Sequence, residues 1–140
     1  MGGFLSFLIS TLIVFWEYKN QPTIITIDNE PPRELVTNNI VIGNCKYFGG
    51  GMKILPNAEP DDGKFDVMII GDLNKIEVYT NIFKLYKGNH IYQPKVEIMR
   101  ACKIKIECKT QDLLLDVDGE QIGTTPVEIS VIPKAIKIIC

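Results

Sequence analysis

Residues 103–109 read Lys-Ile-Lys-Ile-Glu-Cys-Lys and alternate without a break between polar and apolar side chains. Successive side chains of a β-strand point to opposite faces, so one face of this strand packs on a core and the other meets water. We interpret its lysines as the solvated face and not as a binding site. The alternation predicts a half-buried strand in an antiparallel sheet.

Short apolar or alternating segments recur along the chain, separated by Gly, Pro, Asn and Asp. Many short strands with only two helices favour a mainly β fold, an antiparallel β-sandwich with helical additions. The further predicted strands are Thr23–Ile27, Leu35–Ile42, Phe65–Ile70, Leu113–Val117, Val127–Ile132 and Ala135–Ile139.

One later segment, Asn74–Tyr86, has the pattern of a helix. Asn74 can cap its first turn, Glu77 follows three residues later, and Gly88 supplies the stop. Four apolar residues then share one stripe, which we expect to be a core face. They are Ile76, Tyr79, Phe83 and Tyr86.

The most apolar segment is Phe4–Trp16, FLSFLISTLIVFW. It is shorter than the roughly 20 residues that span a bilayer, and no basic residue precedes it as in a secretory signal. A helix that is apolar on nearly all sides is buried on more than one face. We therefore expect an N-terminal core or interdomain helix, with a membrane-surface element or a signal as the alternatives.

The chain has 140 residues, a mass of 15.8 kDa, 46% hydrophobic residues and a formal charge of −2. This length predicts a single domain over residues 1–140 and excludes a large two-domain enzyme within this chain. The charge gives no indication of nucleic-acid binding, which needs a surplus of Lys and Arg. Four scattered cysteines and the single His90 do not form a zinc tetrad. We expect reduced thiols in a cytoplasmic protein; the cysteines are Cys45, Cys102, Cys108 and Cys140.

Residues 44–67 read NCKYFGGGMKILPNAEPDDGKFDV. Three consecutive glycines, Gly49, Gly50 and Gly51, permit positive φ and suit a bulge, a tight loop or the close approach of a ligand. No Gly-Lys-Ser/Thr follows, so this is not a Walker loop. Asp61-Asp62-Gly63 reads as a turn, and its oxygens are also ligands suited to a hard cation.

Residues 116–120 read Asp-Val-Asp-Gly-Glu. An Asp-Gly pair between strands is a strong hairpin signal. A hairpin does not require Glu120, whereas a carboxylate at the rim of a sheet can act as a general base when its pKa is raised. The residues alone leave both interpretations open.

Several motifs follow one another along the chain: Asn-x-x-x-Phe-Gly-Gly-Gly-x-x-Ile-x-Pro-x-Ala-x-x-Asp-Asp-Gly-x-x-Asp-Val, then Gly-x-His, then Asp-Gly-Glu and Pro-x-Ala-x-x-Ile. This ordered set resembles the C-terminal domain of the diacylglycerol kinase and sphingosine kinase family. The resemblance covers nearly all the chain from about Ile24. It implies the lipid-acceptor side of a two-domain kinase whose N-terminal domain binds ATP through Gly-Gly-Asp-Gly-Thr, a sequence that does not occur here.

The resemblance also implies roles for particular residues. Glu120 corresponds to the general base of phosphoryl transfer, with Asp118 and Asp116 as supporting acids. A structural Mg²⁺ would be held by Asp62 and the main-chain carbonyls of Glu59 and Lys64. The remaining motif residues, in the cleft loop, are Asn44, Gly49, Gly50 and Gly51.

The implied partners are ATP as co-substrate, the missing nucleotide-binding domain and a lipid substrate. The protein is expected to be cytoplasmic and to associate peripherally with a membrane surface. Self-association into a homo-oligomer is consistent with the apolar N-terminal segment. Two alternatives stay open. One is a non-catalytic β-sandwich module that binds lipid or protein. The other is a related kinase that acts on a sphingoid base or NAD, although NAD kinases resemble this chain less.

Overall fold

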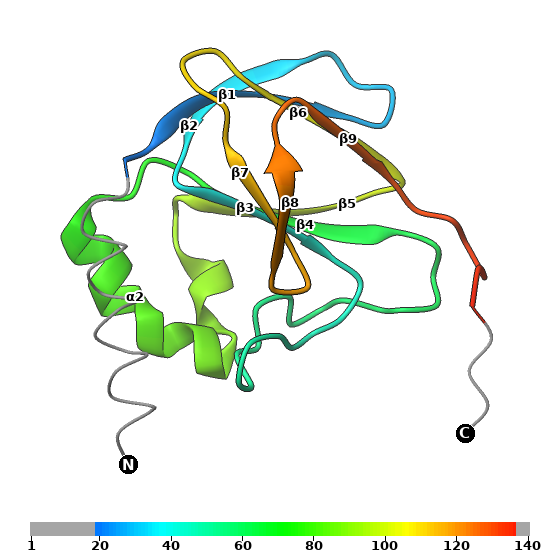
Figure 1. Ribbon diagram of the computed structural model, residues 1–140. Helices are drawn as coiled ribbons and strands as arrows, with labels where there is room; N and C mark the ends of the chain where they lie inside the picture. Colours follow the sequence, from blue (N-terminus) through cyan, green and yellow to red (C-terminus); the bar gives the residue numbers. More distant parts are fainter. Residues whose placement is uncertain (1–18, 137–140) are drawn as a thin grey trace.

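The computed structural model describes residues 19–136 (Figure 1). The predicted helix Phe4–Trp16 and most of the predicted strand Ala135–Ile139 lie outside these residues. The elements are β1 (Gln21–Ile27), β2 (Arg33–Thr37), β3 (Asn39–Gly43), β4 (Phe65–Ile70), α2 (Lys75–Lys87), η1 (Asn89–Tyr92), β5 (Val96–Ala101), β6 (Lys103–Cys108), β7 (Leu114–Val117), β8 (Glu120–Thr124) and β9 (Val127–Ser130).

The strands form antiparallel sheets in the orders β2-β1-β6-β9, β3-β4-β5 and β7-β8. The first two sheets pack face to face, which confirms the sandwich-like, mainly β prediction. The buried core between them consists of Ile25, Ile27, Val67, Ile69, Ala101, Ile104 and Ile106.

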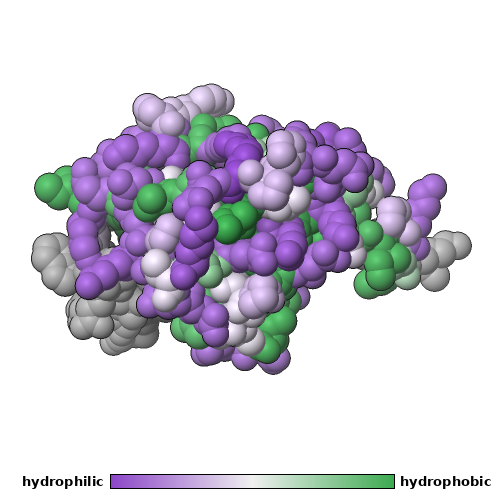
Figure 2. Space-filling view, turned by 90° about the horizontal axis from the view of Figure 1, so that it is seen from above, coloured by the Kyte–Doolittle hydropathy of each residue, from purple (hydrophilic) through white to green (hydrophobic). Residues whose placement is uncertain are grey.

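The strand β6 has the bounds that its alternation predicts, Lys103–Cys108. Ile104 and Ile106 are buried in the sandwich, whereas Lys103 and Lys105 are exposed and form ion pairs on the outer face. Figure 2 views the molecule from the side of this sheet and shows a largely hydrophilic surface with scattered hydrophobic residues. The lysines therefore belong to a solvated face, as predicted.

The strand β4 is buried on both faces. Val67 and Ile69 belong to the core of the sandwich, whereas Met68 belongs to a second cluster with Ile54 and Leu55. Alternate side chains of a strand serve opposite faces, so the β3-β4-β5 sheet is the middle of three layers. Its far face is covered by the loop around residues 54–58 and by α2.

The strands differ from the prediction in three places. The segment Leu35–Ile42 is two strands, because Asn38 donates its backbone N–H to Ile70 (2.8 Å) where the chain crosses from one sheet to the other. The strands β5 and β8 were not predicted. β8 reads Glu-Gln-Ile-Gly-Thr and pairs with β7 in a two-stranded sheet, so neither of its faces needs a regular apolar pattern.

The helix α2 begins and ends as predicted. Asn74 accepts a hydrogen bond from the Glu77 backbone (2.9 Å), Glu77 accepts one from the Asn74 backbone (2.7 Å), and Gly88 is left-handed with φ 74°. The predicted core stripe is wrong, however, because Ile76 is 75% exposed and Phe83 72%. The helix instead turns a second apolar stripe, Val78, Ile82 and Leu85, toward the sheet.

Candidate functional site

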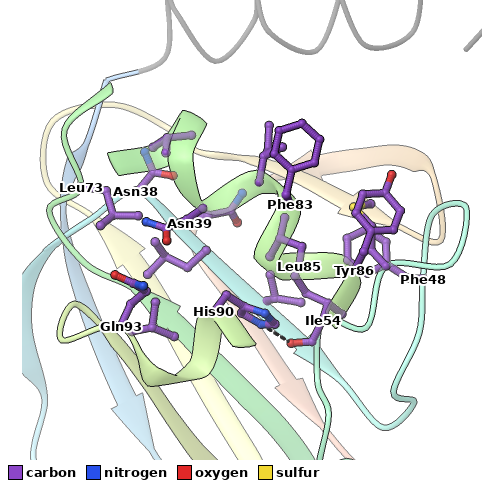
Figure 3. A pocket seen from close by; sticks show the side chains of 17 residues that line it. Asn38, Asn39, Phe48, Ile54, Leu73, Phe83, Leu85, Tyr86, His90 and Gln93 are labelled. Atoms are coloured by element: carbon purple, nitrogen blue, oxygen red, sulfur yellow. Dashed lines mark hydrogen bonds between the residues drawn. The ribbon is translucent and has the colours of Figure 1, made fainter. Parts of the chain in front are cut away.

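An apolar pocket of about 360 Å³ lies between α2, the far face of the β3-β4-β5 sheet and the glycine-rich loop (Figure 3). Segments that are distant in sequence meet around it. Its lining residues are mostly apolar: Val41, Phe48, Met52, Ile54, Ile70, Leu73, Val78, Ile82, Phe83, Leu85, Tyr86 and Val96, with Asn38, Asn39, Asn81, His90 and Gln93 as the polar members.

The three glycines of the glycine-rich loop all have positive φ: Gly49 45°, Gly50 66° and Gly51 93°. Residues with a Cβ rarely adopt this conformation. The reversal lets the backbones of Phe48 and Met52 exchange two hydrogen bonds of 3.1 Å. This confirms the predicted tight loop, whose two flanking side chains help to line the pocket.

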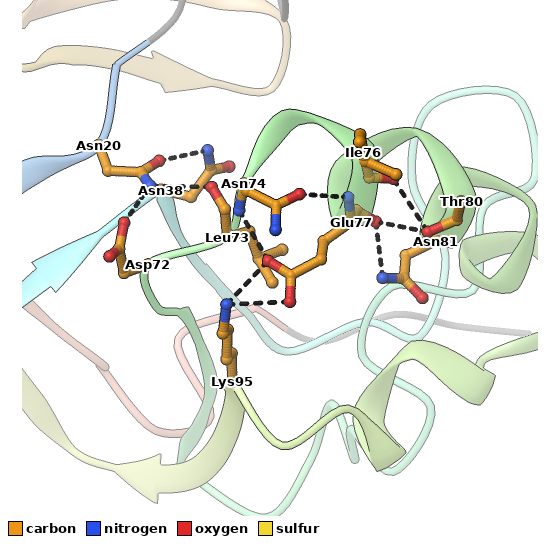
Figure 4. Close-up of polar contacts among 10 residues, drawn as sticks. All are labelled: Asn20, Asn38, Asp72, Leu73, Asn74, Ile76, Glu77, Thr80, Asn81 and Lys95. Atoms are coloured by element: carbon orange, nitrogen blue, oxygen red, sulfur yellow. Dashed lines mark hydrogen bonds and ion pairs between the residues drawn. The ribbon is translucent and has the colours of Figure 1, made fainter.

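Polar contacts at the N-terminus of α2 hold the pocket walls together (Figure 4). Lys95, just before β5, donates to both carboxylate oxygens of Glu77 at 2.8 and 2.9 Å. These contacts lower the pKa of the Glu77 carboxyl, chiefly through the Lys95 hydrogen bond and then through the backbone of Asn74. At the other side Asn20 donates to the Leu73 carbonyl (2.9 Å) and accepts from Asn38 (2.8 Å). The helix is thus tied to β5 and to the start of β1.

His90 and Asn81 are two polar residues of the pocket lining. His90 is 3% exposed, and its Nε2 lies 2.8 Å from the Ile54 carbonyl oxygen. Asn81 donates its side-chain amide to the Glu77 carbonyl (2.6 Å). Sequence reasoning missed both residues. The Gly-x-His pattern after the helix marked the position of His90 but gave no reason for its burial.

The segment Asp116–Glu120 forms the β7–β8 turn, with Val117 paired to Glu120. Asp118 and Gly119 have φ of 52° and 87°, as a two-residue hairpin turn requires. Asp116 accepts a hydrogen bond from the Gly119 backbone (2.9 Å) and so stabilises the turn.

The side chain of Glu120 is exposed just beyond the turn and does not line the pocket. In Figure 1 the turn and the loops around residues 44–60 lie toward the same, lower side of the view. An exposed carboxylate is available to a substrate or to another domain, and its role as a base stays a prediction.

The segment Asp61–Gly63 is a turn, as predicted. Asp62 accepts a hydrogen bond from the Lys64 backbone through Oδ1 (2.9 Å) and forms an ion pair with Arg100 through Oδ2. Glu59 and Asp66 also lie near the Arg100 guanidinium, at 3.8 and 3.9 Å. Arg100 was not predicted, because it comes from β5, far away in the sequence.

Asp66 is 2% exposed, and its Oδ2 has no hydrogen bond among the described residues. Burial raises the pKa of the Asp66 carboxyl, and the nearby charge of Glu59 raises it further. The Arg100 guanidinium thus has three carboxylates around it, whose oxygens are donors of the kind that a hard cation binds.

Within residues 19–136, no group of three or more His, Cys, Asp or Glu side chains is arranged to hold a metal. The predicted magnesium site relies on one carboxylate and two main-chain carbonyls, and a cation there would compete with Arg100 for Asp62. Asn44, assigned to the cleft loop, is exposed and accepts from the Cys45 thiol; it does not line the pocket. The predicted site residues therefore occupy three separate turns.

Comparison with known proteins gives relatives that are lipid kinases by name. The chain is 29% identical to a diacylglycerol kinase of Mycobacterium tuberculosis over 69% of this chain and 31% of the relative. It is 32% identical to a diacylglycerol kinase of Staphylococcus epidermidis, over 70% and 31%. For sphingoid long chain base kinase 5 of Saccharomyces cerevisiae the identity is 30%, over 73% and 15%. The chain thus spans about a third or less of the length of these relatives.

Solved structures share the fold. One chain from Bacillus anthracis str. Sterne has a TM-score of 0.68 and 26% identity, covering 89% of this chain and 40% of that one. A diacylglycerol kinase from the same organism has a TM-score of 0.63 at 21% identity, covering 89% and 44%.

In residues 19–136, no helix is long and apolar enough to cross a membrane. A family model described as "YegS C-terminal NAD kinase beta sandwich-like domain" matches residues 1–140, the whole chain. Its relatives are named diacylglycerol, lipid and sphingoid base kinases. The chain therefore belongs to the YegS C-terminal domain family.

Proposed function

We propose that this chain is the acceptor-side domain of an ATP-dependent lipid kinase that phosphorylates the hydroxyl of diacylglycerol or a similar lipid. The observation that carries this proposal is the apolar pocket of about 360 Å³ between α2 and the sheet. The apolar lining suits an acyl chain, because burial of each CH₂ group stabilises binding by about 0.8 kcal/mol. The volume is in the range of known ligand pockets. The names of the relatives support the same substrate class.

The chemistry of phosphoryl transfer indicates which catalytic steps this domain would carry out. The γ-phosphoryl passes through a loose transition state, so catalysis consists mainly of positioning the hydroxyl, stabilising charge and accepting the hydroxyl proton. In the proposal the pocket positions the lipid, and Glu120 Oε accepts the proton at the exposed hairpin turn. Asp116 holds this turn through the Gly119 backbone. ATP binds on the nucleotide-binding domain of the complete enzyme.

The pocket is tested by filling it. Val41→Phe places a larger side chain in the lining, and the resulting overpacking should weaken binding of 1,2-dioctanoylglycerol about tenfold. Isothermal titration calorimetry on the 140-residue chain measures this change. The matched control is Val36→Phe, because Val36 is exposed on β2 and does not line the pocket. No saturable binding to the wild type, or equal binding to Val41→Phe, would contradict the proposed pocket.

We propose that the exposed face of α2 contacts the membrane that carries the lipid. Ile76, Phe83 and Tyr86 are exposed apolar residues on this helix, and Phe83 and Tyr86 also line the apolar pocket. Such a patch binds other apolar surfaces. In the absence of vesicles, the same apolar surface would allow two copies of the chain to associate.

Ile76→Glu should weaken binding to phosphatidylcholine–diacylglycerol vesicles about tenfold, because burial of an Ile side chain contributes about 1.5–3 kcal/mol. Ile132→Glu is the matched control, since Ile132 lies outside α2 and is equally exposed, at 75%. Vesicle flotation gives the bound fraction. If the two substitutions weaken vesicle binding equally, the proposal that α2 contacts the membrane is wrong.

We also propose that the Asp61–Gly63 turn holds Mg²⁺ through Asp62 and the main-chain carbonyls of Glu59 and Lys64. Mg²⁺ typically keeps several waters, so three protein ligands suffice. A bound ion would strengthen the turn, and Arg100 supplies the competing positive charge.

Arg100→Gln should therefore enlarge the stabilisation by Mg²⁺. Binding to the native state alone stabilises it by about 2.7 kcal/mol at a hundredfold excess over Kd. Millimolar Mg²⁺ should raise the Tm of the wild type, raise that of Arg100→Gln by more, and leave Asp62→Ala unchanged in differential scanning fluorimetry. If Mg²⁺ shifts none of the three, the segment is only a turn.

A further inference from the structure

The turn that contains Asp62 is paired with a side chain from a distant strand, Arg100 of β5. The two oxygens of the Asp62 carboxylate have different partners. Oδ1 accepts the Lys64 backbone N–H within the turn (2.9 Å), whereas Oδ2 forms the ion pair with the Arg100 guanidinium. Since the turn itself uses Oδ1, a cation that binds Asp62 competes with Arg100 for Oδ2.

Arg100 has a second acidic neighbour, in the sheet. The register of β4 and β5 places Asp66 directly opposite Arg100, and side chains at opposite positions of an antiparallel pair have Cβ atoms about 5 Å apart. Asp66 Oδ2 lies 3.9 Å from Arg100 Nε, which is beyond hydrogen-bond distance. The guanidinium thus lies between a carboxylate of the turn and a carboxylate of the sheet, and it is paired closely with the first.

The Asp66 carboxylate lacks a hydrogen bond on Oδ2. Its side chain is 2% exposed, and within residues 19–136 this oxygen accepts from no donor. A buried acceptor without a donor is unfavourable, and a hydrogen bond from a charged donor is stronger than a neutral one. Glu59, the third carboxylate near Arg100, has a side chain that is 64% exposed and is solvated by water. An Arg100 side chain released from Asp62 would therefore gain most from a bond to Asp66.

We propose that Arg100 stands in for the cation at Asp62 and moves to Asp66 Oδ2 when Mg²⁺ binds. This inference rests on the proposed magnesium site and adds its regulation. A movement of about 1 Å brings Nε from 3.9 Å to hydrogen-bond distance, and the Arg100 side chain is 41% exposed, so it has room to turn. Asp62 then has a positive partner with or without the ion. Asp66 acts on the site through Arg100 and not as a ligand of the ion.

Two substitutions should change Mg²⁺ binding in opposite directions. Arg100→Gln removes the competitor and should tighten binding, whereas Asp66→Asn removes the second position of Arg100 and should weaken binding about tenfold, as the loss of one charged hydrogen bond does. Isothermal titration calorimetry with MgCl₂ on the 140-residue chain gives the Kd values, and thermal melts verify that the variants fold. Glu97→Gln is the matched control, because this carboxylate of β5 pairs with Arg33. Its Kd should equal that of the wild type.

The double variant Arg100→Gln/Asp66→Asn separates this mechanism from a direct effect of the Asp66 charge on the ion. Without Arg100, Asp66→Asn should change the Kd less than threefold. A tenfold loss in this background as well would overturn the inference, because Asp66 would then act on the ion directly. Wild-type affinity of Asp66→Asn alone would overturn it too, and both results would leave the magnesium site intact. If Mg²⁺ binds neither the wild type nor Arg100→Gln, the magnesium site and this inference are both wrong.

An NMR measurement on the wild type observes the movement of Arg100 without any substitution. The sequence contains two arginines, Arg33 and Arg100. Arg33 donates two hydrogen bonds to Glu97, at 2.9 and 3.0 Å, so its Nε–Hε resonance is an internal reference. Saturating Mg²⁺ should shift the Arg100 Nε–Hε resonance and leave that of Arg33 in place. An Arg100 resonance that stays unchanged at saturating Mg²⁺ would overturn the inference.

Discussion

Glu120→Gln should lower kcat by about 10²- to 10⁴-fold once the chain is joined to the ATP-binding half of a related kinase, because general-base catalysis contributes a factor of this size. Gln keeps the shape of Glu but cannot accept the hydroxyl proton as a carboxylate does. The turn itself is made by Asp116, Asp118 and Gly119 and should remain intact. Initial rates at saturating ATP and lipid give the comparison.

The control for this substitution is Glu128→Gln, which removes another exposed carboxylate of the domain, on β9, where it pairs with Lys103. Its kcat should equal that of the wild type. If Glu120→Gln keeps kcat within about threefold of the wild type, a dominant role as general base is ruled out, since the effect would lie far below the range for such a residue.

The 140-residue chain alone should form no phosphatidic acid from ATP and diacylglycerol. Phosphoryl transfer requires groups that hold the triphosphate and stabilise its charge, and the sequence contains no Gly-Gly-Asp-Gly-Thr motif for this purpose. Thin-layer chromatography with radiolabelled ATP measures the product, and the fusion with an ATP-binding half is the positive control. ATP-dependent product from the chain alone would show that it holds a complete active site.

Local signals in the sequence predicted the parts of the fold that depend on neighbours along the chain. The alternation of residues 103–109 gave β6, the apolar run gave β4, and the capping residues Asn74 and Glu77 gave α2. The exposed stripe of α2 shows that local signals do not predict which face of a helix is buried. The helix carries two apolar stripes, and only the packing against the sheet decides that the stripe with Val78 faces inward.

In the site, too, the parts that depend on neighbouring residues were predicted, and the parts that depend on residues distant in sequence were not. The three turns that contain Gly50, Asp62 and Glu120 follow from residues that favour turns, and the structure has all three. The pocket was not predicted, because its walls are distant in sequence and meet only through the layering of the fold. The pairing of Arg100 with Asp62 was missed for the same reason, since it joins β5 to a loop.

A competition assay tests the central claim, that this domain presents a lipid alcohol for phosphorylation. The chain joined to an ATP-binding half is incubated with ATP and equal concentrations of dioctanoylglycerol, sphingosine and NAD, and mass spectrometry identifies the phosphorylated product. The expected product is a phosphorylated lipid, formed in smaller amount by the Val41→Phe variant, in which the pocket is filled. Phosphorylated NAD as the main product, or a lipid phosphate formed equally well by the Val41→Phe variant, would contradict it.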